Sequence, residues 1–238
     1  MKQEYIISGI VIIITGFFFF VCIKFINPTH KQDTNIKRPS KNHVQTIKIE
    51  KNRLMNIEEF KKNWGPSPIP TELEQLIYFQ TNKSAFEFYS RGFGVIVDDK
   101  GGLKSWNEDI SFLNQLFPFA QANGTGSFYA IWNDGTTKPL NEMPIVVFGD
   151  EGGVHIVAQN ILQLLHLITF DTEISVEFDD VYFYKDENEY QKSKDLDAFL
   201  KWLKNDYNLD PVQDPAVIIA SAQKKYKETF DKWFKQYD

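Results

Sequence analysis

The pattern of hydrophobic and polar positions divides the chain into an apolar segment, a polar linker and a globular body. Residues 5–23 form a run of nineteen residues without a charge. At ~1.5 Å per residue, a helix of this length spans roughly 28 Å, close to the ~30 Å apolar core of a bilayer. The run is longer than the apolar region of a cleaved signal peptide, and no small-residue cleavage site follows it. We therefore predict one N-terminal transmembrane helix within residues 1–26, contacting the membrane through residues 5–25, rather than a cleaved leader or a buried soluble helix.

Residues 27–52 have no apolar periodicity, which is typical of a linker. The linker is basic, with six Lys or Arg residues against Asp33 and Glu50. More cations follow the apolar run than precede it, and cytoplasmic flanks carry the excess of Lys and Arg. The pattern predicts a single-pass protein of the inner membrane whose C-terminal body is cytoplasmic. A basic linker would also be attracted to an anionic inner leaflet.

From residue 53 onward, short apolar patterns of both helical and strand period alternate with turn signals. Helices are predicted at residues 57–64, 71–80, 107–116, 160–168 and 196–204. Strands are predicted at residues 86–89, 93–97, 116–122, 127–132, 144–148, 154–158 and 181–184. Thr71 is the expected N-cap of its helix, with Glu74 completing a capping box. The prediction for residues 53–210 is an α+β domain in which helices flank an antiparallel or mixed sheet.

Residues 211–238 are predicted to form a C-terminal amphipathic helix, with Asp214 as its N-cap and Pro215 at its first position. Its apolar residues recur at steps of three and four: Ile219, Ala222, Tyr226, Phe230, Trp233 and Tyr237. This stripe is expected to cover the sheet or the flank of the domain. The alternative is that it docks a partner.

Composition and motifs argue against catalysis. Cys22 is the one cysteine and lies in the apolar run, which excludes a disulfide framework, a cysteine zinc site and a cysteine nucleophile. The sequence lacks the G-x-S-x-G, P-loop and H-E-x-x-H motifs. The turn at residues 149–153 carries two carboxylates and no lysine, so it is unsuited to phosphate. We predict no catalytic residue, no metal and no cofactor. The body has 18 Lys or Arg against 29 Asp or Glu, which argues against a nucleic-acid binder.

The most informative surface candidate is the stretch at residues 171–189. It holds eight carboxylates against Lys185 alone, and aromatic residues interleave with them. One interpretation is a solvated edge strand whose charges discourage aggregation. The other is a docking face for a basic protein, steered by carboxylates and anchored by aromatic rings. The predicted partner-binding residues are Asp179, Asp180, Tyr182, Tyr184, Asp186 and Glu187, together with Trp106 and Trp132 at a hollow beside the turn 149–153. Strand alternation predicts that Phe183 points into the core instead.

A family resemblance rests on residues 124–167, which contain GTGSFYAIW followed by MPIVVFGDEGGVHIVAQNILQLLHLI. A glycine-rich hairpin, a P-[IV]-V-x-F-G strand, a G-[DE]-x-G turn and an amphipathic helix in this order resemble the SUKH superfamily, as does Ile69-Pro70-x-x-Leu73 at the start of a helix. The resemblance extends over residues 60–205. The N-terminal anchor and the extension after residue 210 depart from the usual form of the family.

The resemblance implies a non-enzymatic binder, since the superfamily includes cell-wall assembly regulators and bacterial immunity proteins. The leading expectation is a membrane-anchored immunity protein that binds and masks a basic toxin domain. The second is a membrane-tethered scaffold or regulator of cell-envelope assembly. A hydrolase with an unrecognised site is the third.

Overall fold

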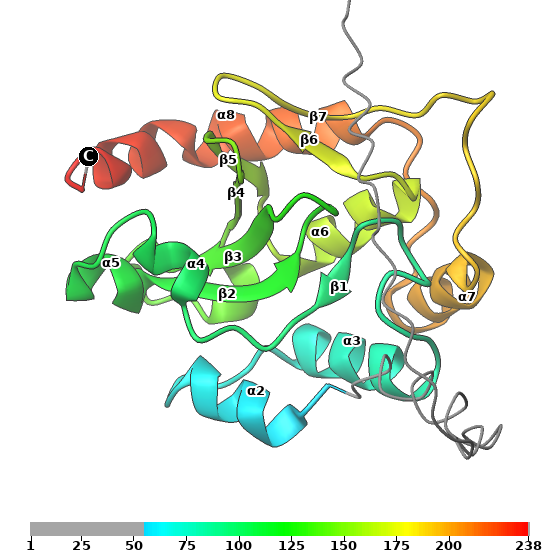
Figure 1. Cartoon of the computed structure of the whole chain (residues 1–238), viewed down its shortest axis with the longest axis horizontal. Helices are drawn as coiled ribbons and strands as arrows, with labels where there is room; N and C mark the ends of the chain where they lie inside the picture. Colours follow the sequence, from blue (N-terminus) through cyan, green and yellow to red (C-terminus); the bar gives the residue numbers. More distant parts are fainter. Residues whose placement is uncertain (1–54, 238) are drawn as a thin grey trace, which may run out of the picture. The chain divides into compact units, whose positions relative to one another are not determined.

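The computed structural model describes residues 55–237, and its centre is a five-stranded antiparallel sheet (Figure 1). The strands are β1 (Gly94–Val95), β2 (Leu116–Gln121), β3 (Phe128–Trp132), β4 (Ile145–Phe148) and β5 (Val154–Ala158). Each pairs with its sequence neighbours, so the order in the sheet is the order in the chain. This confirms the predicted α+β class with an antiparallel sheet flanked by helices.

Both faces of the sheet are buried, and the strands are therefore apolar on both sides. On β3, Tyr129 and Ile131 belong to one hydrophobic cluster. The alternate residues Phe128, Ala130 and Trp132 belong to a second cluster on the opposite face. This period of two is the ordinary pleat of a strand, and it fixes which helix each side chain contacts.

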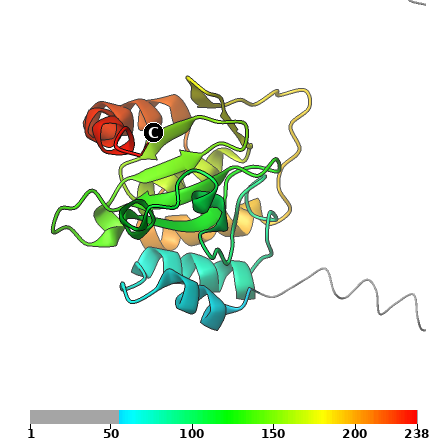
Figure 2. The same ribbon diagram turned by 60° about the vertical axis from the view of Figure 1, so that its left-hand side comes forward.

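Helices cover the two faces unequally. The first face packs on α2 (Ile57–Trp64), α3 (Thr71–Asn82), α6 (Ile161–Leu167) and α7 (Leu196–Tyr207). The second face packs on α4 (Gly101–Lys104), α5 (Ile110–Gln115) and α8 (Pro215–Phe234). In Figures 1 and 2 the sheet lies between α8 on one side and α2 and α3 on the other.

The predicted stripe of α8 covers the sheet rather than facing solvent. Phe230 is 2% exposed, and its ring meets Trp132 of β3 edge to face at 5.0 Å. Trp233 stacks on Phe112 of α5 at 5.6 Å. Asp214 caps the helix by accepting a hydrogen bond from Ala216 N at 3.0 Å, and Pro215 is the first helical residue, as predicted.

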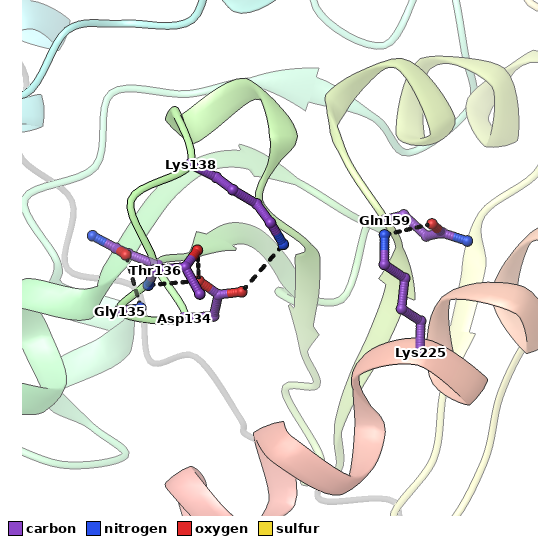
Figure 3. Close-up of polar contacts among 7 residues, drawn as sticks. Asp134, Gly135, Thr136, Lys138, Gln159 and Lys225 are labelled. Carbon is purple, nitrogen blue, oxygen red and sulfur yellow. Dashed lines mark hydrogen bonds and ion pairs between the residues drawn. The ribbon is translucent and has the colours of Figure 1, made fainter.

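Figure 3 shows two polar contacts beside α8, one that joins the helix to the residue after β5 and one within the loop that follows β3. Lys225 Nζ donates to Gln159 Oε1 at 3.2 Å, while Lys138 Nζ lies 4.0 Å from Asp134 Oδ2. Both ammonium groups also face the ring of Tyr226, at 4.7 and 5.8 Å from its centroid. Such exposed ion and cation–π contacts add little energy individually, and the buried aromatic stripe carries the packing.

A second, two-stranded sheet consists of β6 (Ile174–Val176) and β7 (Val181–Phe183). The strand β7 matches the predicted strand, whereas β6 was not predicted. Two 3-10 turns, Leu140–Glu142 and Ile168–Phe170, complete the described elements.

Some boundaries differ from prediction. The strand expected at residues 86–89 is a turn, because Glu87 takes a positive φ of 64° and Phe88 N donates to Ala85 O. Thr71 is the first helical residue instead of the N-cap. The carbonyl of Pro70 accepts the first helical hydrogen bond from Glu74 N at 3.0 Å, so Pro70 is the cap. The helix expected at residues 107–116 is shortened, since Asp109 caps it and Leu116 already belongs to β2.

Within residues 55–237 no helix has the length and apolarity needed to span a bilayer. The predicted transmembrane segment and the whole basic linker lie outside the described residues.

Candidate protein-binding surface

The β6–β7 hairpin stands against the turn between β4 and β5. His155 Nε2, on β5, lies 2.8 Å from the carbonyl oxygen of Glu177, which makes this histidine structural. Gly153 sits at the closest approach, with a φ of +82°, and a Cβ there would lie 2.0 Å from Glu177 O. Only glycine accepts both that φ and that distance without strain. The two turns are therefore held together by backbone contact.

We call residues 149–153 and 177–182 the two-turn surface. Its exposed carboxylates are Asp150, Glu151, Glu177, Asp179 and Asp180, and these two segments contain no Lys or Arg. Phe178 is 79% exposed and Tyr182 is 39% exposed beside them. An exposed phenylalanine within a field of carboxylates combines an apolar anchor with a negative potential, which is how many protein-binding surfaces are built.

Hydrogen bonds hold several of these acidic groups. Asp150 Oδ1 accepts from Ser127 Oγ at 2.7 Å and from Thr125 Oγ1 at 2.9 Å. These bonds, led by that from Ser127, hold the pKa of Asp150 below its usual value of 3.8. The hydroxyl of Tyr182 donates to Glu177 Oε1 at 2.9 Å, and this bond to a carboxylate raises the pKa of Tyr182. The surface is thus negative at neutral pH.

The segment after β7 is hydrogen-bonded to the body through the buried carboxylate of Asp171, which Tyr190 and Ser193 contact. Asp171 is fully buried at a φ of 58°. Its Oδ1 accepts from Arg91 N at 3.1 Å, and its Oδ2 accepts from Ser193 N at 2.9 Å and the Tyr190 hydroxyl at 2.7 Å. Lys185 lies over Tyr190, 4.1 Å from the ring centroid. Its ammonium also lies 4.4 Å from the centroid of Phe170.

The predicted partner-binding residues fall in four places. Asp179, Asp180 and Tyr182 belong to the two-turn surface. Tyr184, which is 68% exposed, and the neighbouring Asp186 and Glu187 lie on the segment after β7. The two tryptophans lie apart from this acidic stretch in the sequence.

The tryptophans occupy different environments. Trp106 lines a hollow beside the turn at residues 149–152, as expected. Trp132 does not line it, because it is 1% exposed on a central strand whose face is covered by α8. A partner cannot reach Trp132 in this structure, and we withdraw it from the surface. Phe183 is half-buried against the core and against Phe170, in line with the expectation from alternation.

Sequence reasoning missed the contribution of Asp150, Glu151, Glu177 and Phe178 to one surface. The sequence places the turn at residues 149–153 beside the expected hollow, but it does not indicate that the carboxylates of this turn lie next to the acidic stretch. This turn lies next to Glu177 because the β6–β7 hairpin packs against it, and no local sequence pattern predicts that packing. The undetected strand β6 was the missing signal, because its pairing with β7 places Glu177 and Phe178 in the turn.

A second concavity, a groove of about 760 Å³, runs along the edge strand β1 beside α2 and α3. The side chain of Gln80 occupies the strand edge, since its Oε1 accepts from Val95 N at 2.7 Å and its Nε2 donates to Val95 O at 2.9 Å. Edge strands commonly need such protection. Among the described residues no group of His, Cys, Asp or Glu side chains is arranged to hold a metal ion.

Comparison of the chain with protein-family models, with curated proteins and with solved structures gave no match.

Proposed function

We propose that this chain is a membrane-anchored, non-enzymatic binding protein of the SUKH type that captures a basic protein on its two-turn surface. The observation that carries the proposal is the juxtaposition of exposed carboxylates and exposed aromatic rings, without a compensating cation, on two turns in backbone contact. Carboxylates of this kind accelerate encounter with a basic partner, and aromatic rings slow its release.

The partner class follows from charge. A protein that acts on nucleic acid carries basic patches that contact phosphates, and an acidic surface can cover such a patch. We therefore propose an immunity protein that neutralises a cognate bacterial toxin by occlusion at the cytoplasmic side of the inner membrane. The anchor would raise the local concentration of the protein where a toxin arrives. A scaffold or regulator of envelope assembly is the alternative; it predicts envelope defects on deletion when no toxin is present.

The test uses the full chain in detergent micelles as bait, with mass spectrometry to identify captured proteins and stopped-flow kinetics for each purified candidate. Reversing the charge of Asp179 and Asp180 to lysine should slow association by about tenfold or more at low salt. The difference should shrink as salt rises, because exposed charges are screened beyond ~10 Å at 0.1 M.

A matched control reverses Glu74 and Glu142, two exposed carboxylates outside the two-turn surface, and changes the net charge equally. If both pairs of reversals slow association alike, only net charge matters. If the Asp179 and Asp180 reversals leave the rate unchanged in a folded protein, the stretch is a solubilising edge and the proposal fails.

A further inference from the structure

The hollow beside Trp106 borders the two-turn surface. It has a volume of about 460 Å³ and lies between the end of α4, the start of β3 and the β4–β5 turn. Four of its lining residues are glycines, so backbone rather than side chains forms much of its wall. Gly149, Asp150 and Gly152 belong to both the hollow and the two-turn surface, and a Cβ on Gly152 would lie 3.6 Å from the ring of Phe178. A partner on that surface therefore reaches the hollow.

Aromatic rings form the apolar walls of the hollow and are held by packing behind them. Trp106 is half-buried and meets Phe148 edge to face at 5.5 Å, with Phe234 of α8 at 6.3 Å. Phe128 stacks on the same Phe148 at 5.1 Å with an interplanar angle of 6°. The indole is therefore positioned before any ligand arrives, and the ordering entropy of binding is lowered.

Asp150 supplies the polar group of the hollow. Its Oδ1 is occupied by the hydroxyls of Thr125 and Ser127. Within residues 55–237, no hydrogen bond reaches Asp150 Oδ2. The pKa of this carboxyl lies below 3.8, so it is ionised at neutral pH. A carboxylate with an unoccupied oxygen beside an indole repels anions and attracts a cation.

We infer that the Trp106 hollow receives an arginine side chain of the partner, with the guanidinium against the indole and an N–H donated to Asp150. This inference rests on the proposed function, because the arginine belongs to the protein bound at the two-turn surface. Arginine fits better than lysine, since its planar, weakly hydrated guanidinium stacks on aromatic rings and donates in a fork to carboxylates. The carboxylates alone would attract any basic protein, whereas the hollow would select a partner with an arginine at the matching position.

The experiment uses the full chain in detergent micelles, labelled with 5-fluorotryptophan. The five tryptophans of the sequence give five ¹⁹F signals, and Trp106→Phe identifies the one that belongs to residue 106. N-acetyl-arginine amide is the probe, and N-acetyl-citrulline amide is its neutral isostere. We expect the arginine probe to move the Trp106 signal saturably, the citrulline probe to leave it unmoved, and Asp150→Asn to weaken the arginine effect about tenfold.

Controls separate local effects from unfolding. Glu142→Gln removes an exposed carboxylate outside both the hollow and the two-turn surface, and it should change the affinity for the arginine probe less than twofold. Ser105→Phe should block the hollow without touching Asp150, and the four other signals report whether each variant is folded. Because the pKa of Asp150 is low, binding should be constant between about pH 5 and pH 7.

The inference is overturned if the arginine probe leaves the Trp106 signal unmoved, if citrulline moves it equally, or if N-acetyl-lysine amide binds more tightly. These outcomes do not touch the proposed function, which fails separately if reversal of Asp179 and Asp180 leaves partner association unchanged.

Discussion

Asp171 and Asp179 belong to the same acidic stretch, yet they end in opposite environments. Asp179 is exposed on the two-turn surface, whereas Asp171 is buried and accepts three hydrogen bonds. One donor, the backbone N–H of Arg91, lies 80 residues away in the sequence. The sequence could show that the stretch is acidic, but not which carboxylate ties distant segments together.

This difference predicts unequal effects of substitution on stability. Asp171→Ala leaves buried donors without an acceptor and should lower the free energy of unfolding by ~3 kcal/mol. Asp171→Asn should cost less, because asparagine tolerates the positive φ and keeps one acceptor oxygen. Asp179→Ala, on the surface, should stay within ~0.5 kcal/mol.

Urea denaturation of the three variants, followed by tryptophan fluorescence, measures these differences. Equal midpoints for Asp171→Ala and Asp179→Ala would show that the buried carboxylate does not hold the segment after β7.

At the scale of elements, a matched pair on α8 tests whether its aromatic stripe stabilises the body. Phe230→Ala opens a cavity against Trp132 and Trp233 and should lower the free energy of unfolding by ~3–5 kcal/mol. Thr229→Ala, one residue earlier on the exposed side, should change it by less than ~0.5 kcal/mol.

Thermal unfolding of both variants by circular dichroism provides the measurement. A normal transition in Phe230→Ala would mean that α8 is dispensable for the core, and that its stripe is available to a partner after all.

Strong local signals explain which elements the sequence predicted well. The hairpins β2–β3 and β4–β5 have glycine-rich turns between apolar runs, and α8 has a cap, a proline and five buried stripe residues. The strand β6 has three residues and no turn signal before it, so only pairing with β7 reveals it. The strand expected around Phe88 is wrong because the chain turns there, with Glu87 in the left-handed region, which an apolar pattern does not report.

At the scale of the candidate site, the sequence predicted the acidic character and two of the surface aromatics, Tyr182 and Tyr184. The continuous apolar run of β3 is typical of a strand buried on both faces, but only the packing shows that α5 and α8 cover the face that holds Trp132. The sequence also could not join Asp150 to Phe178, since their proximity follows from packing of two hairpins.

For the whole molecule, the linker and the body carry net charges of opposite sign. The linker carries a net charge of +4, from six cations against two anions, and the body from residue 53 carries −11, from 18 against 29. If the apolar run spans the inner membrane as proposed, an anionic inner leaflet would attract the linker and repel the body. We therefore expect the acidic surface to face the cytoplasm rather than the bilayer, where a basic protein can reach it.

Reporter fusions can test on which side of the membrane the body lies, which the charges of residues 24–41 predict. Lys24, Lys31, Lys37, Arg38 and Lys41 follow the apolar run, whereas Lys2 precedes it. Because such an excess is retained on the cytoplasmic side, alkaline phosphatase fused to the C-terminus of the full chain should be inactive, and green fluorescent protein fused there should fluoresce. Replacing the five following cations with glutamine, as the matched variant, should weaken this preference and raise phosphatase activity. Strong phosphatase activity from the unaltered chain would place the body outside the cytoplasm, and capture of a toxin at the inner face would then be untenable even if the two-turn surface binds basic proteins.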